Sequence, residues 1–187
     1  MQTCKWFVPV VAILLSVALG MPVIAAEQTL NDADKAFVKK AVSGGKMEVE
    51  LGQMAKTKAK SQEVKDFGAM MVKEHGKAND ELKTILNKKN MKVPRKLEVK
   101  HNATKMMLKP LSAEKFDKQY MEHMVSDHMK DVTEFKEAQQ TLADQDIKGW
   151  VEKTLPVLEK HLEKAREVAA KVGVDPEKIK SDKKTDK

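Results

Sequence analysis

The sequence predicts an all-α protein, a four-helix bundle in which two antiparallel hairpins are joined by a long crossover. Three observations predict this fold class. Aromatic residues make up only 4% of the 187 residues, a composition that suits helix interfaces better than a pleated sheet. Four segments of similar length carry apolar residues at steps of three and four. The first two segments and the last two are joined by very short connections, which favour hairpins.

The N-terminal residues 1–26 have the pattern of a secretory signal peptide. Lys5 precedes the uncharged stretch 6–20, and small residues at Ala25 and Ala26 suit cleavage by signal peptidase. We expect the mature domain to be periplasmic or secreted. An uncleaved membrane anchor is the alternative, because the apolar segment is about as long as a membrane-spanning helix.

The mature domain contains no cysteine, because the single cysteine, Cys4, lies within the signal segment. Disulfides are therefore excluded, and an apolar core alone must hold the fold together. A chain of this size can bury such a core.

We expect residues 27–172 to form the bundle domain and residues 173–187 to form a lysine-rich, flexible tail. A connection of about 23 residues separates the hairpins, and residues 95–108 within it are expected to form a short helix. One long crossover is the topology of ferritin-like bundles, and an up-and-down arrangement is the alternative. The four long helices are expected over residues 34–60, 62–89, 113–142 and 146–172.

The crossover concentrates positive charge in a chain whose net charge is +7. Between Lys88 and Lys109 there are eight basic residues and one acid, Glu98. Such a segment can meet an anionic envelope surface, or it can be a solvated loop. No aromatic residues interleave for base stacking, so we do not expect nucleic acid as a partner. The oligomeric state is not indicated.

A short repeat relates the second expected helix to the third. Residues 71–77 and residues 124–130 have the same types of side chain at the same helical positions, at an offset of 53 residues. Chance similarity between lysine-rich helices is the alternative. In the first helix, Gly44 and Gly45 lie near the inward face, where small residues allow close helix approach.

Four polar residues lie near the middle of the apolar stripes, one on each expected helix: Glu48, His75, His128 and His161. The two members of each hairpin lie at similar distances from its turn, so all four approach the mid-plane of the bundle. A buried ionisable group without a partner costs several kcal/mol. These residues therefore predict a site for a transition metal such as zinc, copper or iron.

Glu74 and Asp127 are adjacent to two of these histidines and lie on the flanks of the same stripes, so they join the candidate set. The alternative is a set of histidines and acids that hydrogen-bond to one another and fix the helix register. Di-iron bundles carry a Glu and a His three residues apart on each of two helices, and the four long helices expected here lack this spacing, which argues against an oxidase. The candidate metal ligands are Glu48, Glu74, His75, Asp127, His128 and His161.

A set of motifs is spread over the expected helices: Phe37-Val38, Gly44-Gly45, residues 48–52, residues 71–75, Phe116-Asp117, Tyr120 and His128. Together they resemble a bacterial family of exported, ferritin-like domains, which is catalogued as a domain of unknown function and often labelled predicted outer-membrane protein. The resemblance spans Asp34 to about Val172. It implies a four-helix bundle and export, and it supplies no established activity or ligand.

Nothing in the sequence resembles a nucleophile elbow, a phosphate loop or a nucleotide fingerprint, so a binding protein is favoured over an enzyme. The leading hypothesis is an exported protein that binds a transition metal at the mid-bundle cluster. The alternative is an envelope stress or interaction protein that acts through its surface and basic crossover, with purely structural histidines.

Overall fold

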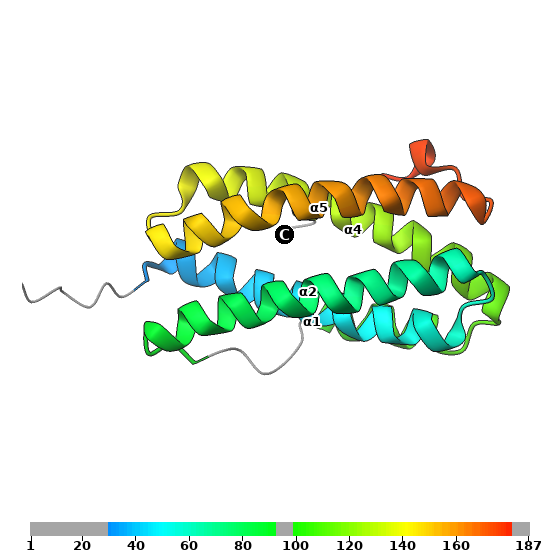
Figure 1. The fold of residues 1–187 in the computed structure, drawn as a ribbon, viewed down its shortest axis with the longest axis horizontal. Helices are drawn as coiled ribbons and strands as arrows, with labels where there is room; N and C mark the ends of the chain where they lie inside the picture. Colours follow the sequence, from blue (N-terminus) through cyan, green and yellow to red (C-terminus); the bar gives the residue numbers. More distant parts are fainter. Residues whose placement is uncertain (1–29, 93–98, 181–187) are drawn as a thin grey trace, which may run out of the picture.

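A computed structural model describes residues 30–92 and 99–180 of the chain. Two antiparallel hairpins lie side by side (Figure 1) and confirm the predicted all-α bundle. The first hairpin contains α1 (Asp32–Lys58) and α2 (Gln62–Lys88), and the second contains α4 (Ala113–Thr141) and α5 (Gln145–Lys171). The short helix α3 (Val99–Leu108) lies in the crossover, and the 3-10 helix η1 (Pro176–Lys178) follows α5.

The crossover runs back along the bundle, so the topology is the ferritin-like one and not up-and-down. In Figure 1, α2 ends at the end of the bundle where α1 begins, and α4 begins at the opposite end. The contacts agree, because Asp117 in the first turn of α4 binds the backbone of the α1–α2 turn at Lys60 and Ser61. Helices α2 and α4 therefore run parallel.

The helix ends follow from capping side chains. Asn31 accepts a hydrogen bond from the backbone of Asp34 at 2.8 Å, which moves the start of α1 two residues ahead of the expected one. Ser61 and Asp144 are the N-caps of α2 and α5. The expected short helix over 95–108 is present from Val99, and residues 93–98 lie outside the described part.

The first part of the expected tail packs on the bundle. Gly173 has φ of +79°, the left-handed conformation that ends a helix, and the Val174 amide donates to the Ala169 carbonyl at 2.9 Å. Ile179 packs against the apolar core, and the Ser126 hydroxyl donates to the Lys180 carbonyl at 3.0 Å. Residues 181–187, like the expected signal segment, lie outside the described residues.

The apolar core is divided into two clusters along the bundle axis. One contains Leu51, Phe67 and Tyr120, and the other contains Leu82 and Trp150. Fully burying one such side chain contributes about 1.5–3 kcal/mol. The four polar residues predicted to face inward fall between these clusters, so an ionisable layer is enclosed by apolar packing on both sides.

Helices α1 and α2 approach most closely at a glycine pair. A Cβ atom on Gly52 would lie 2.6 Å from the Gly68 carbonyl oxygen, and one on Gly68 would lie 2.7 Å from the Ala55 Cβ. Of the two glycines expected to allow close helix approach, Gly45 does so against α2 and Gly44 does not. Gly45 makes room for the Asn79 side chain, while a Cβ on Gly44 would meet no atom within 4 Å.

Each hairpin turn is held by a buried carboxylate from the other hairpin. Asp117 accepts from the amides of Lys60 and Ser61 at 3.1 and 2.8 Å. Asp34 accepts from the amides of Ala143 and Asp144, both at 3.1 Å. Asp117 lies 83 residues after Asp34, and α5 begins 83 residues after α2, so the two hairpins carry the same brace at equivalent positions.

Replacing Asp117 by alanine should destabilise the bundle by about 1–3 kcal/mol, because two amides of the α1–α2 turn lose their acceptor. Urea unfolding measures this change. Asp117→Asn keeps one acceptor and should lose less, and Asp32→Ala, at a fully exposed side chain, should stay within about 0.5 kcal/mol. An Asp117→Ala protein as stable as the Asp32→Ala protein would contradict the brace.

Candidate metal site

Three histidines from three helices meet in the polar layer: His75 on α2, His128 on α4 and His161 on α5. All three are buried, with exposed fractions of 6%, 0% and 1%. Their ring centroids lie 5.0–5.6 Å apart. One potential ligand nitrogen of each lies within 4.8 Å of the other two. The fold therefore brings together three of the six predicted site residues as one cluster that can hold a metal ion.

The hydrogen bond of His128 fixes which of its nitrogens is free. Its Nδ1 lies 2.8 Å from the Met124 carbonyl oxygen, one turn earlier in α4. A carbonyl can only accept, so Nδ1 carries the proton and Nε2 of the neutral ring keeps its lone pair.

His161 is oriented by a carboxylate. Its Nε2 lies 2.8 Å from Glu74 Oε2, so Nε2 donates and Nδ1 keeps the lone pair. Glu74 is partly exposed, with a side-chain exposure of 39%. It therefore lies behind the His161 ring, as carboxylates do behind many metal-bound histidines, where they fix the tautomer and the ring orientation.

Three buried ring nitrogens have no hydrogen-bond partner among the described residues: His75 Nε2, His128 Nε2 and His161 Nδ1. Each such atom costs about 1–3 kcal/mol of desolvation. The alternative of histidines and acids that hydrogen-bond to one another and fix the helix register is represented by the His161–Glu74 bond, but not at these three atoms. A metal ion would be one shared partner for all three.

The separation of the nitrogens is somewhat wider than in a formed site. Zinc–nitrogen bonds of about 2.0–2.1 Å place tetrahedral ligand nitrogens roughly 3.3 Å apart. The ligand nitrogens of the three histidines lie at most 4.8 Å apart. The two most distant nitrogens must therefore move closer by at most about 1.5 Å to bind one zinc ion. Small changes of side-chain torsion angle can provide this movement.

All three rings are neutral near pH 7, which is the form that binds metals. Burial lowers the pKa of His75 well below its usual value, and the neighbouring His128 and His161 lower it further. Burial, with a smaller effect of His161, lowers the pKa of His128 to about 4. Burial also lowers the pKa of His161, although the Glu74 carboxylate opposes this shift.

Glu48 faces the same layer from α1 and is fully buried, and neither of its oxygens has a hydrogen-bond partner among the described residues. Burial raises the pKa of Glu48 well above its usual value, and the negative charges of Asp127 and Asp131 raise it further. Glu48 is therefore protonated over a wide pH range, and it and the three histidines are uncharged. It does not join the three-histidine group at ligand distance within the described chain.

Tyr120, which was named above only among the motifs of the family resemblance, also belongs to this neighbourhood. Its hydroxyl is buried without a partner among the described residues. Burial raises the pKa of Tyr120 well above its usual value, and the Glu48 charge adds to the shift. Its place two turns before His128 on one helix face was the available signal.

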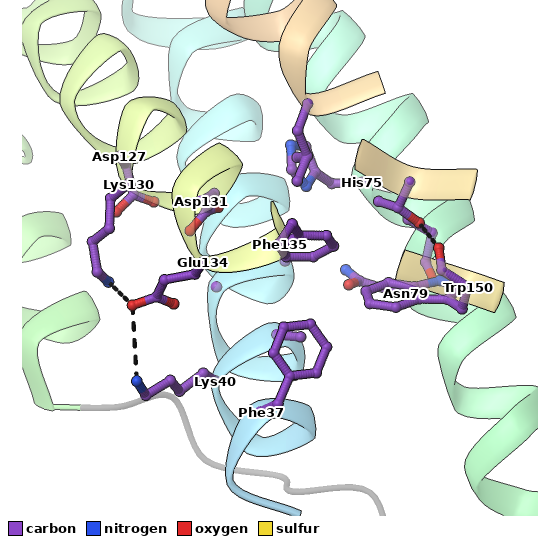
Figure 2. Close-up of a pocket in the computed structure, with 16 residues that line it drawn as sticks. Phe37, Lys40, His75, Asn79, Asp127, Lys130, Asp131, Glu134, Phe135 and Trp150 are labelled. Atoms are coloured by element: carbon purple, nitrogen blue, oxygen red, sulfur yellow. Dashed lines mark hydrogen bonds and ion pairs between the residues drawn. The ribbon is translucent and has the colours of Figure 1, made fainter. Parts of the chain in front are cut away.

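A pocket reaches the cluster from the surface (Figure 2). Asp127 lines it together with Asp131, one turn later on α4, and His75 forms part of its wall. Asp127 therefore lines the pocket next to the cluster and is not a member of the three-histidine group.

The basic crossover makes specific contacts with the bundle. Lys89 pairs with Asp144 and Asp146 at 2.8 and 2.7 Å. Lys105 pairs with Glu50 of α1. These two of the eight basic residues therefore tie the crossover to the hairpins.

A family model described as "Domain of unknown function (DUF4142)" matches residues 20–168, a range that includes all three cluster histidines. The chain belongs to this family. The DUF4142 fold is similar to a crystal structure described as that of a "putative secreted protein DUF305" from Streptomyces coelicolor, with a TM-score of 0.66 and 13% identity. That match covers 77% of this chain and 94% of the other, and it shows a shared fold. No significant match was found among curated proteins.

The metal-free DUF4142 bundle should lose stability as the pH falls from about 6.5 to 4. In this window the unfolded chain binds protons at histidines that stay neutral in the fold, and His128 alone accounts for about 3 kcal/mol. Glu48 acts in the opposite direction. Its pKa is raised in the fold, so its contribution to the free energy of unfolding is present at low pH and is lost as the pH rises above 4.5.

Glu48→Gln should therefore be more stable than the parent at pH 8 and similar to it near pH 4, as measured by urea unfolding with a chelator present. Glu50→Gln is the matched control on α1, since Glu50 is partly exposed, and it should show no such gain. A Glu48→Gln protein that gains nothing at pH 8 would show that the Glu48 carboxyl is not held protonated.

Proposed function

We propose that this DUF4142 protein is an exported, non-enzymatic binding protein that holds one transition-metal ion at His75, His128 and His161. The observation that carries the proposal is the convergence of three buried histidines from three helices, each of which has a ring nitrogen without a partner among the described residues. A single cation can take a lone pair from each of the three rings.

The donor set narrows the class of metal. Neutral imidazoles suit zinc, copper and iron, and the mature domain has no thiolate to offer. Three histidines with an open fourth position are a common protein ligand set for zinc. Glu48, the fully buried carboxyl of the layer, can offset one positive charge of a bound ion by losing its proton.

Export is supported by two independent features. The N-terminal residues have the composition of a signal peptide, and the structurally similar Streptomyces protein is described as secreted. Among residues 30–92 and 99–180, no helix has the length and apolar character needed to cross a membrane. A metal-binding domain in the periplasm or outside the cell fits the two features.

The protein, purified without a polyhistidine tag and stripped with a chelator, should bind one equivalent of Zn²⁺, Cu²⁺ or Fe²⁺ per chain. Titration calorimetry and elemental analysis measure the stoichiometry. At a free-ion concentration 100 times the Kd, the bound ion should stabilise the fold by about 2.7 kcal/mol.

His75→Gln and His128→Gln should each weaken binding by roughly 100-fold or more, because each removes one of three ligands. His123→Gln is the matched control, since His123 lies on α4 outside the cluster and should leave the affinity unchanged. A parent protein that binds none of the three ions stoichiometrically, or a His128→Gln protein that binds them equally well, would refute the proposal.

A further inference from the structure

The pocket in Figure 2 is a continuous space between the bundle surface and the histidine cluster. All four long helices line it, and its volume is about 40 Å³, measured as the space open to the centre of a water molecule. One water needs about 10–15 Å³ by this measure, so the pocket has room for a few waters or a partly hydrated ion. His75 is the one cluster histidine in its wall.

The polar wall of the pocket is suited to cations. Asp127 and Asp131 lie one turn apart on α4 and both line it. Glu134, nearer the surface, is shared by Lys130 at 3.5 Å and Lys40 at 3.8 Å, as Figure 2 shows. Asp127 and Asp131 thus place two carboxylates in the same pocket wall as His75, and negative charge there favours the approach of cations.

The α1 wall of the pocket is open because of a glycine. A Cβ on Gly44 would have no atom within 4 Å, although Gly44 lines the pocket. The adjacent Gly45 has the opposite environment, since a Cβ there would lie 2.1 Å from Asn79 Oδ1. A larger side chain at position 44 can therefore fill the pocket without meeting a packed neighbour.

A second surface pocket offers a competing approach, and its charge makes it less suitable. It lies along α2 and α5 and has no cluster histidine in its lining. Lys73, Lys77 and Lys153 line it together with Glu74 and Glu81. Lys153 pairs with Glu81 at 2.9 Å, which leaves two ammonium groups against the one carboxylate of Glu74, and this balance disfavours the approach of a divalent cation.

We propose that the pocket between Gly44 of α1 and Asp127 and Asp131 of α4 is the route by which a divalent cation reaches the histidine cluster. Gly44 keeps the route open, the two aspartates replace part of the ion's hydration shell, and His75 is the first imidazole that the ion meets. This inference rests on the metal-binding function proposed above.

Stopped-flow mixing of the full, metal-free chain with Cu²⁺, followed by the fluorescence of Trp150 in the pocket wall, tests the route. Gly44→Leu should slow association and dissociation at least tenfold each and leave the equilibrium Kd, measured by calorimetry, unchanged. Asp131→Asn should slow association several-fold and reduce its dependence on salt.

Gly149→Leu is the matched control, because Gly149 is an exposed glycine of α5 with open space around it and no place in the pocket. It should bind Cu²⁺ at the parent rate. Full binding by Gly44→Leu at the parent rate would overturn the route and leave the metal site standing. Slower binding by Val157→Trp in the α2–α5 groove, with Gly44→Leu unaffected, would place the route there instead. No Cu²⁺ binding by the parent at equilibrium would overturn both proposals.

Discussion

The central constraint on this bundle is that three imidazole rings occupy a plane between two apolar clusters, where charge is costly and unpaired nitrogen atoms have no solvent. Burial keeps the rings neutral. The Met124 carbonyl accepts a hydrogen bond from His128 and the Glu74 carboxylate accepts one from His161, and these bonds determine which ring nitrogen keeps its lone pair. Glu48 lies on α1, the one long helix that contributes no histidine, and it avoids a buried charge by retaining its proton. The result is an uncharged layer whose ring nitrogens have unused lone pairs, and a cation can bind to these nitrogens.

Such a layer works only if the helix heights are fixed, because a slip of one residue moves a side chain by about 1.5 Å along the axis and 100° around it. Two devices fix the heights. Asp34 and Asp117 tie each hairpin to the turn of the other at opposite ends of the bundle. Gly52 and Gly68 bring the backbones of α1 and α2 into contact beside the apolar cluster that contains Phe67. The braces are distant from the histidines and still determine whether they converge.

Much of this arrangement could be predicted from local pattern. The apolar stripes gave the four helices, and the inward phase of Glu48 and the histidines gave a polar mid-plane, because both depend only on helical periodicity. The rest depends on contacts between segments far apart in the chain. The pairing of His161 with Glu74 and the carboxylate braces join residues 56–110 positions apart, and no periodicity encodes them. For the same reason the helical pattern does not reveal that Gly52 packs against Gly68.

X-ray absorption at the metal edge of the zinc-loaded protein tests the central claim most directly, because it reports the atoms bound to the ion. Three imidazole nitrogens in one layer predict a first shell that contains three histidine nitrogens at about 2.0–2.1 Å, with the multiple-scattering pattern of imidazole rings. A shell made of oxygen alone, or a three-imidazole shell that persists in His128→Gln, would contradict the account.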